Sequence, residues 1–118
     1  MLSVAVEKLR DAAEALCTLE ASSGGTLEET KALSKRAITC AAYAVSLAFV
    51  DEAKGAREGI LEAMPKAPRY MWADMLRLLE ILRQIERAEK QKLVELAREA
   101  VEIATGIVLS APGGTSHL

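Results

Sequence analysis

The side chains best suited to acid–base catalysis are few in this sequence. Its single histidine, His117, stands next to the C-terminal residue. Ser-His-Asp and Cys-His catalysis both need a histidine held firmly as a general base, whereas residues at a chain end have few neighbours to hold them. We therefore expect no catalytic residues and no activity as an enzyme.

Metal and cofactor motifs are also missing. Cys17 and Cys40 are far apart, and neither has a second cysteine or a histidine nearby, so a zinc site is not expected. The sequence contains no Glu-x-x-His pair for a di-iron centre and no glycine-rich nucleotide motif. Gly24 and Gly25 precede a predicted helix and could hold an anion there, although a connecting turn is the simpler interpretation. We expect no metal and no cofactor.

Two carboxylates remain as a possible acid–base pair. Glu62 and Glu80 lie in mostly apolar stretches, and a buried carboxylate would have a raised pKa of the kind that marks active sites. However, Glu80 has Arg83 and Gln84 three and four residues further on, which is typical of an exposed helix face. We interpret both glutamates as surface charges.

Basic residues form two groups. Lys31, Lys35 and Arg36 share part of one predicted helix, and the second group is Arg77, Arg83, Arg87, Lys90 and Lys92. Such groups can contact phosphate, so the first is our candidate for phosphate contacts in a subunit of a nucleic-acid-binding complex. Two features oppose this alternative: the net charge is −2, and few aromatic residues are available to stack on bases.

The elements that must position these residues are helices. The chain of 118 residues is 51% hydrophobic and 27% charged, which is typical of one globular domain. Ala, Leu, Glu, Lys and Arg dominate between the interruptions at 21–26, 65–68 and 110–118. We predict an all-α fold, an antiparallel bundle of about four or five helices in a single domain spanning 1–118. The predicted helices are 2–20, 27–49, 50–64, 68–87 and 92–109, followed by a flexible tail at 110–118.

Two local patterns refine this prediction. Thr26 and Glu29 form a capping box for the second helix. Residues 37–50 are almost wholly apolar, which predicts a helix surrounded by neighbours on several sides. The polar stretch 86–92 leaves the last part of the chain open: 68–109 forms either one long helix or two helices that meet at a break.

Location follows from the apolar stretches and the cysteines. The run 37–50 is shorter than the roughly 20 residues that span a bilayer, and the first residues do not resemble a secretory signal. A hairpin of the first two helices would place Cys17 and Cys40 roughly 15 Å apart along the helix axis, too far for a disulfide. We predict two free, buried thiols and a cytoplasmic protein that does not enter a membrane.

Three stretches resemble one another at a spacing of 44 residues, namely 6–15, 50–59 and 94–103. This spacing suits a duplicated two-helix unit, as in helical repeat proteins. The alternative is that Ala- and Glu-rich helices share such identities by chance.

The apolar residues of the last segment indicate a surface for another chain. Tyr, Trp and Met often anchor protein interfaces, and a long helix that overhangs a short core would need to be covered. The predicted interface residues are Tyr70, Met71, Trp72, Leu76, Leu79, Leu82, Leu93 and Leu96. We therefore predict a non-enzymatic structural or interaction module that forms a homo-oligomer, with a dimer as the first candidate, or binds a partner protein. The lack of asparagine also suits a thermostable or a designed helical protein.

Overall fold

The stretches rich in Ala, Leu and Glu fold as helices. The computed structural model describes residues 2–22 and 25–111, in which five α-helices and two short 3₁₀ turns occur and no strand is present. The elements are α1 (Leu2–Ala21), α2 (Leu27–Leu47), α3 (Ala56–Ala63), η1 (Met64–Lys66), η2 (Arg69–Met71), α4 (Trp72–Gln84) and α5 (Lys90–Ser110). The predicted all-α bundle is confirmed. None of the described helices is long and apolar enough to cross a bilayer.

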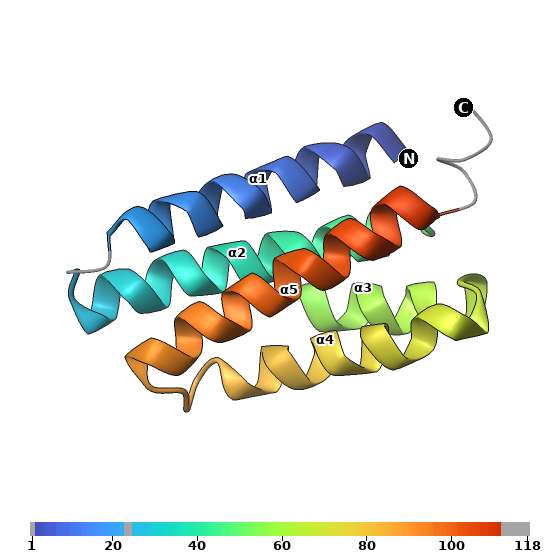
Figure 1. Ribbon diagram of the computed structural model, residues 1–118. Helices are drawn as coiled ribbons and strands as arrows, with labels where there is room; N and C mark the ends of the chain where they lie inside the picture. Colours follow the sequence, from blue (N-terminus) through green and yellow to red (C-terminus); the bar gives the residue numbers. More distant parts are fainter. Residues whose placement is uncertain (1, 23–24, 112–118) are drawn as a thin grey trace.

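Helix α2 is the centre of the bundle. It runs antiparallel to α1 and lies between α1 on one side and α3 and α4 on the other, with α5 crossing in front of it (Figure 1). It contacts all four of these helices. Ala37, Ile38, Ala41 and Val45 are completely buried, because a helix that is apolar all round can hide its surface only if other helices cover each side. The predicted central position of this segment is confirmed.

The ends of α2 have different causes. At its start, the Thr26 hydroxyl accepts a hydrogen bond from the backbone N–H of Glu29 at 3.1 Å, which confirms the predicted cap. After Leu47 the chain turns, and residues 50–55 are not helical. The prediction of a helix over 50–64 is therefore wrong in its first six residues. Gly55 has extended backbone angles and precedes the first turn of α3, and a glycine inside a helix is unfavourable.

A break at residues 85–89 separates α4 from α5. The turn is held by hydrogen bonds from the N–H groups of Arg87 and Ala88 to the carbonyl of Gln84, both 3.1 Å. The break allows α5 to reverse direction, so that Ile81 and Leu93 become fully buried in one core. One long helix would leave much of this apolar surface in water. At the other end, residues 69–71 form η2, and α4 begins only at Trp72.

The spacing of 44 residues does not correspond to a repeat of helix pairs. The stretches 6–15 and 94–103 lie inside α1 and α5, whereas 50–59 spans a loop and the first turn of α3. Helix α3 has 8 residues, compared with 20 in α1 and 21 in α5. The outer stretches share the composition of amphipathic helices, and the middle stretch differs in structure.

Gly59 allows α3 to pack directly on α2. A Cβ atom at Gly59 would lie 2.6 Å from the Oγ atom of Ser46 and 2.9 Å from the Cβ atom of Ala53. Ser46 is itself buried, and its hydroxyl donates to the Ala42 carbonyl at 2.8 Å. Because these neighbours belong to packed segments, a larger residue at position 59 would push the two helices apart.

We therefore expect Gly59→Ala to lower the free energy of unfolding by about 1–3 kcal/mol, because overpacking outweighs the gain in helix propensity. Gly106→Ala is the matched control. This residue lies inside α5, is exposed, and a Cβ atom there would meet nothing within 4 Å. The control should raise the stability by up to about 1 kcal/mol. Urea unfolding of both variants measures the difference, and equal stabilisation by both would contradict the close α2–α3 contact.

Candidate functional site

The predicted interface residues divide between the core and the surface. Met71, Leu93 and Leu96 are at most 2% exposed, so the chain's own core covers them and another chain could not reach them. The expected overhang is absent from the described structure, because α5 folds back against α2 and α4. Three residues are half-buried against the core, namely Trp72, Leu79 and Leu82.

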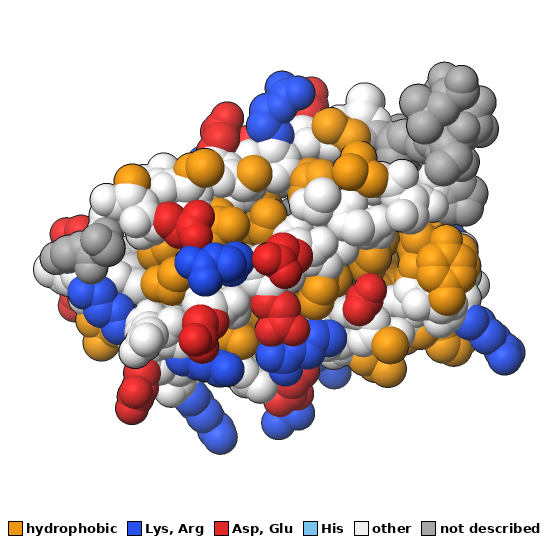
Figure 2. Space-filling view, in the orientation of Figure 1, with side chains coloured by type: hydrophobic (Ala, Val, Ile, Leu, Met, Phe, Trp, Pro, Cys, Tyr) orange, Lys and Arg blue, Asp and Glu red, His pale blue; other side chains and the backbone are white. Residues whose placement is uncertain are grey.

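Two of the predicted interface residues are open to solvent. Tyr70 is 73% exposed and Leu76 is 55% exposed. Ala73, midway between them in sequence, is exposed as well. We call these three residues the apolar corner. Figure 2 shows apolar side chains over the region where the 3₁₀ turns lead into α4.

Trp72 anchors the backbone beneath this corner. Its indole Nε1 donates a hydrogen bond to the carbonyl of Ala67 at 3.2 Å. The guanidinium of Arg69 lies 5.7 Å from the centre of the Trp72 ring, within the range of a cation–π contact. The indole therefore has a polar partner inside the chain and closes one end of the core. It holds η2 against the start of α4.

The first predicted basic group lies beside the turn between α4 and α5. Lys31 and Lys35 each place their Nζ atom 3.9 Å from the carboxylate of Glu86. Arg36 is exposed and lines neither of the hollows described next. The carboxylate of Glu86 partly neutralises the two lysines, which the sequence alone does not indicate because more than 50 residues separate them.

Two open hollows flank Arg83. The first has a volume of about 350 Å³ and the second about 290 Å³. The first is lined by Glu80, Arg83, Gln84, Arg87, Ala88 and Lys92. The second is lined by Lys35, Thr39, Ala56, Arg57, Glu58, Leu82, Arg83, Ile85 and Glu86. Arg83 therefore forms the ridge between them.

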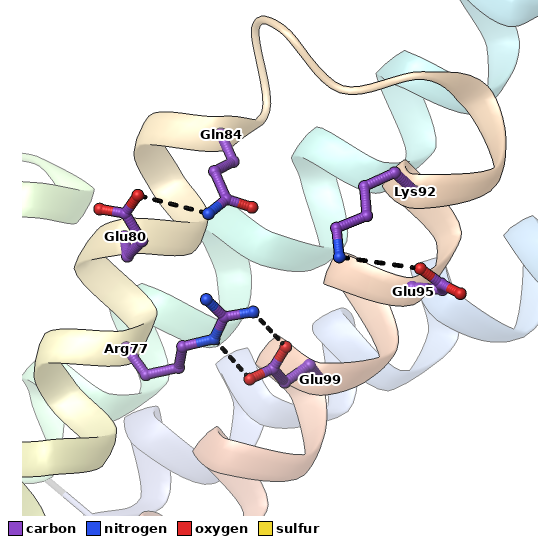
Figure 3. A network of polar contacts seen from close by, with 6 residues as sticks. All are labelled: Arg77, Glu80, Gln84, Lys92, Glu95 and Glu99. Carbon is purple, nitrogen blue, oxygen red and sulfur yellow. Dashed lines mark hydrogen bonds and ion pairs between the residues drawn. The ribbon is translucent and has the colours of Figure 1, made fainter.

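A network of polar contacts joins α4 to α5 (Figure 3). The Nε and Nη2 atoms of Arg77 donate to the two carboxylate oxygens of Glu99 at 2.6 and 2.8 Å. This two-point bond lowers the pKa of Glu99 below its usual value and raises that of Arg77. Lys92 and Glu95 form a longer ion pair of 3.9 Å beside it.

The two glutamates considered for catalysis do not form a buried pair. Glu62 is exposed on α3. Glu80 accepts hydrogen bonds from Gln84 at 3.3 Å and from Arg83 at 3.2 Å. These contacts agree with the interpretation of both residues as surface charges. Among residues 2–22 and 25–111, no group of three or more potential ligands could hold a metal ion.

The cysteines are free, as predicted, but neither is fully buried, so the prediction of buried thiols is wrong. Cys17 is exposed on α1, because Leu16 and Leu19 on either side of it turn toward the core. Cys40 is half-buried, and burial, together with the nearby charge of Asp11, raises the pKa of its thiol. Gly24, His117 and all but the first two residues of the predicted tail at 110–118 lie outside the described residues.

A groove between α1 and α5 was not expected from the sequence. It has a volume of about 560 Å³, and Leu19 and Val94 lie in its apolar lining. The Arg98 Nη2 atom bonds the Glu20 carboxylate across it at 2.7 Å. Lys90 donates a hydrogen bond to the carbonyl of Gly25. Figure 2 shows the apolar side chains in the valley between these two helices.

The Arg77–Glu99 pair predicts a specific dependence of stability on pH. Because the pKa of Glu99 is lower in the folded chain, its contribution is present above the usual carboxyl pKa of about 4.3 and is lost as the pH falls through the folded pKa. Glu99→Gln should lower the free energy of unfolding by about 0.5–1 kcal/mol at pH 7, a small effect because both side chains are more than a third exposed.

Urea unfolding of this variant and the unmodified chain, repeated from pH 7 down to about pH 3, measures the difference. The difference in unfolding free energy between the two proteins should disappear as the pH falls toward about 3. A gap of constant size would show that the carboxylate charge of Glu99 does not stabilise the fold.

The chain matches no protein-family model, no curated protein and no solved structure.

Proposed function

We propose that this chain is a non-enzymatic helical interaction module that binds another protein chain through the apolar corner at Tyr70, Ala73 and Leu76. A second copy of the same chain is the first candidate partner, giving a homodimer. The observation that supports the proposal is the exposure of Tyr70 and Leu76 next to a firmly held tryptophan.

The chemistry of the corner suits an interface. A tyrosine offers a large apolar ring with a polar tip, and it loses little conformational entropy when it is fixed. Burying a leucine side chain stabilises a complex by about 1.5–3 kcal/mol. Leu61, on helix α3, which contacts α4, is also 42% exposed.

Contacts within the chain hold the backbone of the corner in place. The Trp72 indole is bonded to Ala67 and covered by Arg69. Preorganisation of this kind reduces the entropy that binding must overcome. The two free cysteines further support a reducing compartment, and we propose the cytoplasm.

Size-exclusion chromatography with light scattering, across a concentration series, tests the proposal. We expect a dimer at high concentration. The double variant Tyr70→Gln with Leu76→Gln should shift it to the monomer by weakening the dimer at least tenfold, because two anchors of this kind contribute more than 1.4 kcal/mol.

Leu27→Gln with Leu109→Gln provides the control, since these leucines are 54% and 65% exposed on other helices. The control should remain dimeric. A monomer at every concentration would exclude a second copy as the partner, and a dimer that persists in the corner variant would place the interface elsewhere.

A further inference from the structure

We propose that the two hollows beside Arg83 form a binding surface for the phosphodiester backbone of a double-stranded nucleic acid. This surface lies near the turn between α4 and α5, and the apolar corner lies at the opposite end of α4. The proposal therefore does not depend on the proposed protein interface.

Tertiary folding gathers the positive charge. The cations that line the hollows come from α2, α3, α4, the turn after α4, and α5. They are Lys35, Arg57, Arg83, Arg87 and Lys92. Three carboxylates line the same hollows, those of Glu58, Glu80 and Glu86. Five cations against three carboxylates give a local charge of +2, whereas the whole chain carries −2. A locally positive charge on a chain with a negative net charge indicates a surface that binds an anion.

These cations are available to a ligand. Arg83 is the most exposed of the paired cations, at 77% of its side chain. Among the residues that the structure describes, it pairs only with Glu80, one helical turn away, at 3.2 Å. Lys35 reaches Glu86 at 3.9 Å, and Arg87 forms no ion pair with any residue in the described ranges. Exposed pairs are worth about 0–1 kcal/mol, so a phosphate can replace these carboxylates at little cost.

The lining of the hollows favours a nucleic-acid backbone over a protein. No aromatic residue lines either hollow. The large apolar residues that are exposed in the described part of the chain also lie outside both hollows. A protein interface would be expected to offer such anchors, and single-stranded nucleic acid would be expected to stack on aromatic rings.

The shape of the surface also suits an extended ligand. The volumes of about 350 and 290 Å³ are at the low end for enclosing a small molecule. The charges instead spread over four helices, on both sides of one exposed ridge. Guanidinium groups bind phosphate in a two-point geometry, and three of the five cations are arginines. Contacts of this kind ignore base sequence and weaken as salt is added.

Fluorescence anisotropy with labelled duplexes of about 20 base pairs, one of DNA and one of RNA, tests the proposal on the full chain. We expect Kd values of about 1–100 µM at low salt, and a steep loss of affinity as salt increases. The two duplexes distinguish which backbone is preferred. No binding of either duplex at about 100 µM protein would overturn the proposal.

A pair of charge-matched variants locates the site. Arg83→Glu with Arg87→Glu should weaken binding at least tenfold and reduce the slope of log K against log salt by about 2, one for each lost phosphate contact. Arg10→Glu with Lys66→Glu changes the net charge equally at exposed positions outside both hollows. Equal loss in both variants would overturn the assignment of the site. Circular dichroism checks that each variant is folded.

Removal of the carboxylate charge of Glu86, which lines the second hollow, should strengthen duplex binding rather than weaken it. Glu86→Gln keeps the size of a side chain that is 67% exposed and removes its charge. It should tighten duplex binding about threefold, since one fewer repulsive charge at roughly 7 Å in water has that effect. Unchanged or weaker binding would overturn the proposal. So would tighter binding of poly-glutamate than of either duplex, because it would identify an acidic protein as the ligand.

Discussion

The burial of α2 is the constraint on which the rest of the structure depends. Its second half offers water almost no polar side chain, so α1, α3, α4 and α5 must together cover it. The small side chains of Ala37, Ala41 and Ala44 allow the neighbouring helices to approach closely. The other features of the fold help to bury the apolar surface of α2. The absence of a Cβ atom at Gly59 is one example, since it lets α3 sit against Ser46.

The same constraint determines what remains on the surface. To cover α2, the chain must reverse after α4, and the polar residues of the turn stay in water while Ile81, Ile85 and Leu93 face inward. The reversal leaves charged side chains at one end of α4 and apolar ones at the other. Figure 2 shows this division along the face that carries α4 and α5. One helix therefore connects two surfaces of different chemistry, which we propose bind a protein and a polyanion.

Contacts between α5 and the other helices are polar as well as apolar. Arg77–Glu99 joins α4 to α5, and Glu20–Arg98 joins α1 to α5. Each pair is partly exposed, so its contribution to stability is small. Their effect is instead to favour one position of α5 relative to its neighbours. This holds most for Arg77–Glu99, because a two-point guanidinium–carboxylate bond tolerates little displacement.

The sequence by itself determined the helical class, the central position of the apolar segment 37–50 and the cap at Thr26. These depend on local propensity and on the period of the apolar residues, both of which can be read along the chain. It did not determine that Leu93 and Leu96 face the chain's own core. A helix face needs an apolar partner, but its pattern does not say whether that partner belongs to the same chain or to another. The position of Cys17 was predicted wrongly for a similar reason, since it lies at the edge of an apolar stripe whose width depends on the neighbouring helices.

Only the tertiary structure decided that Lys35, Arg57, Arg83 and Lys92 meet around two hollows. That meeting depends on the direction in which each turn sends the next helix, and distant charges contribute nothing to the local pattern that specifies a helix.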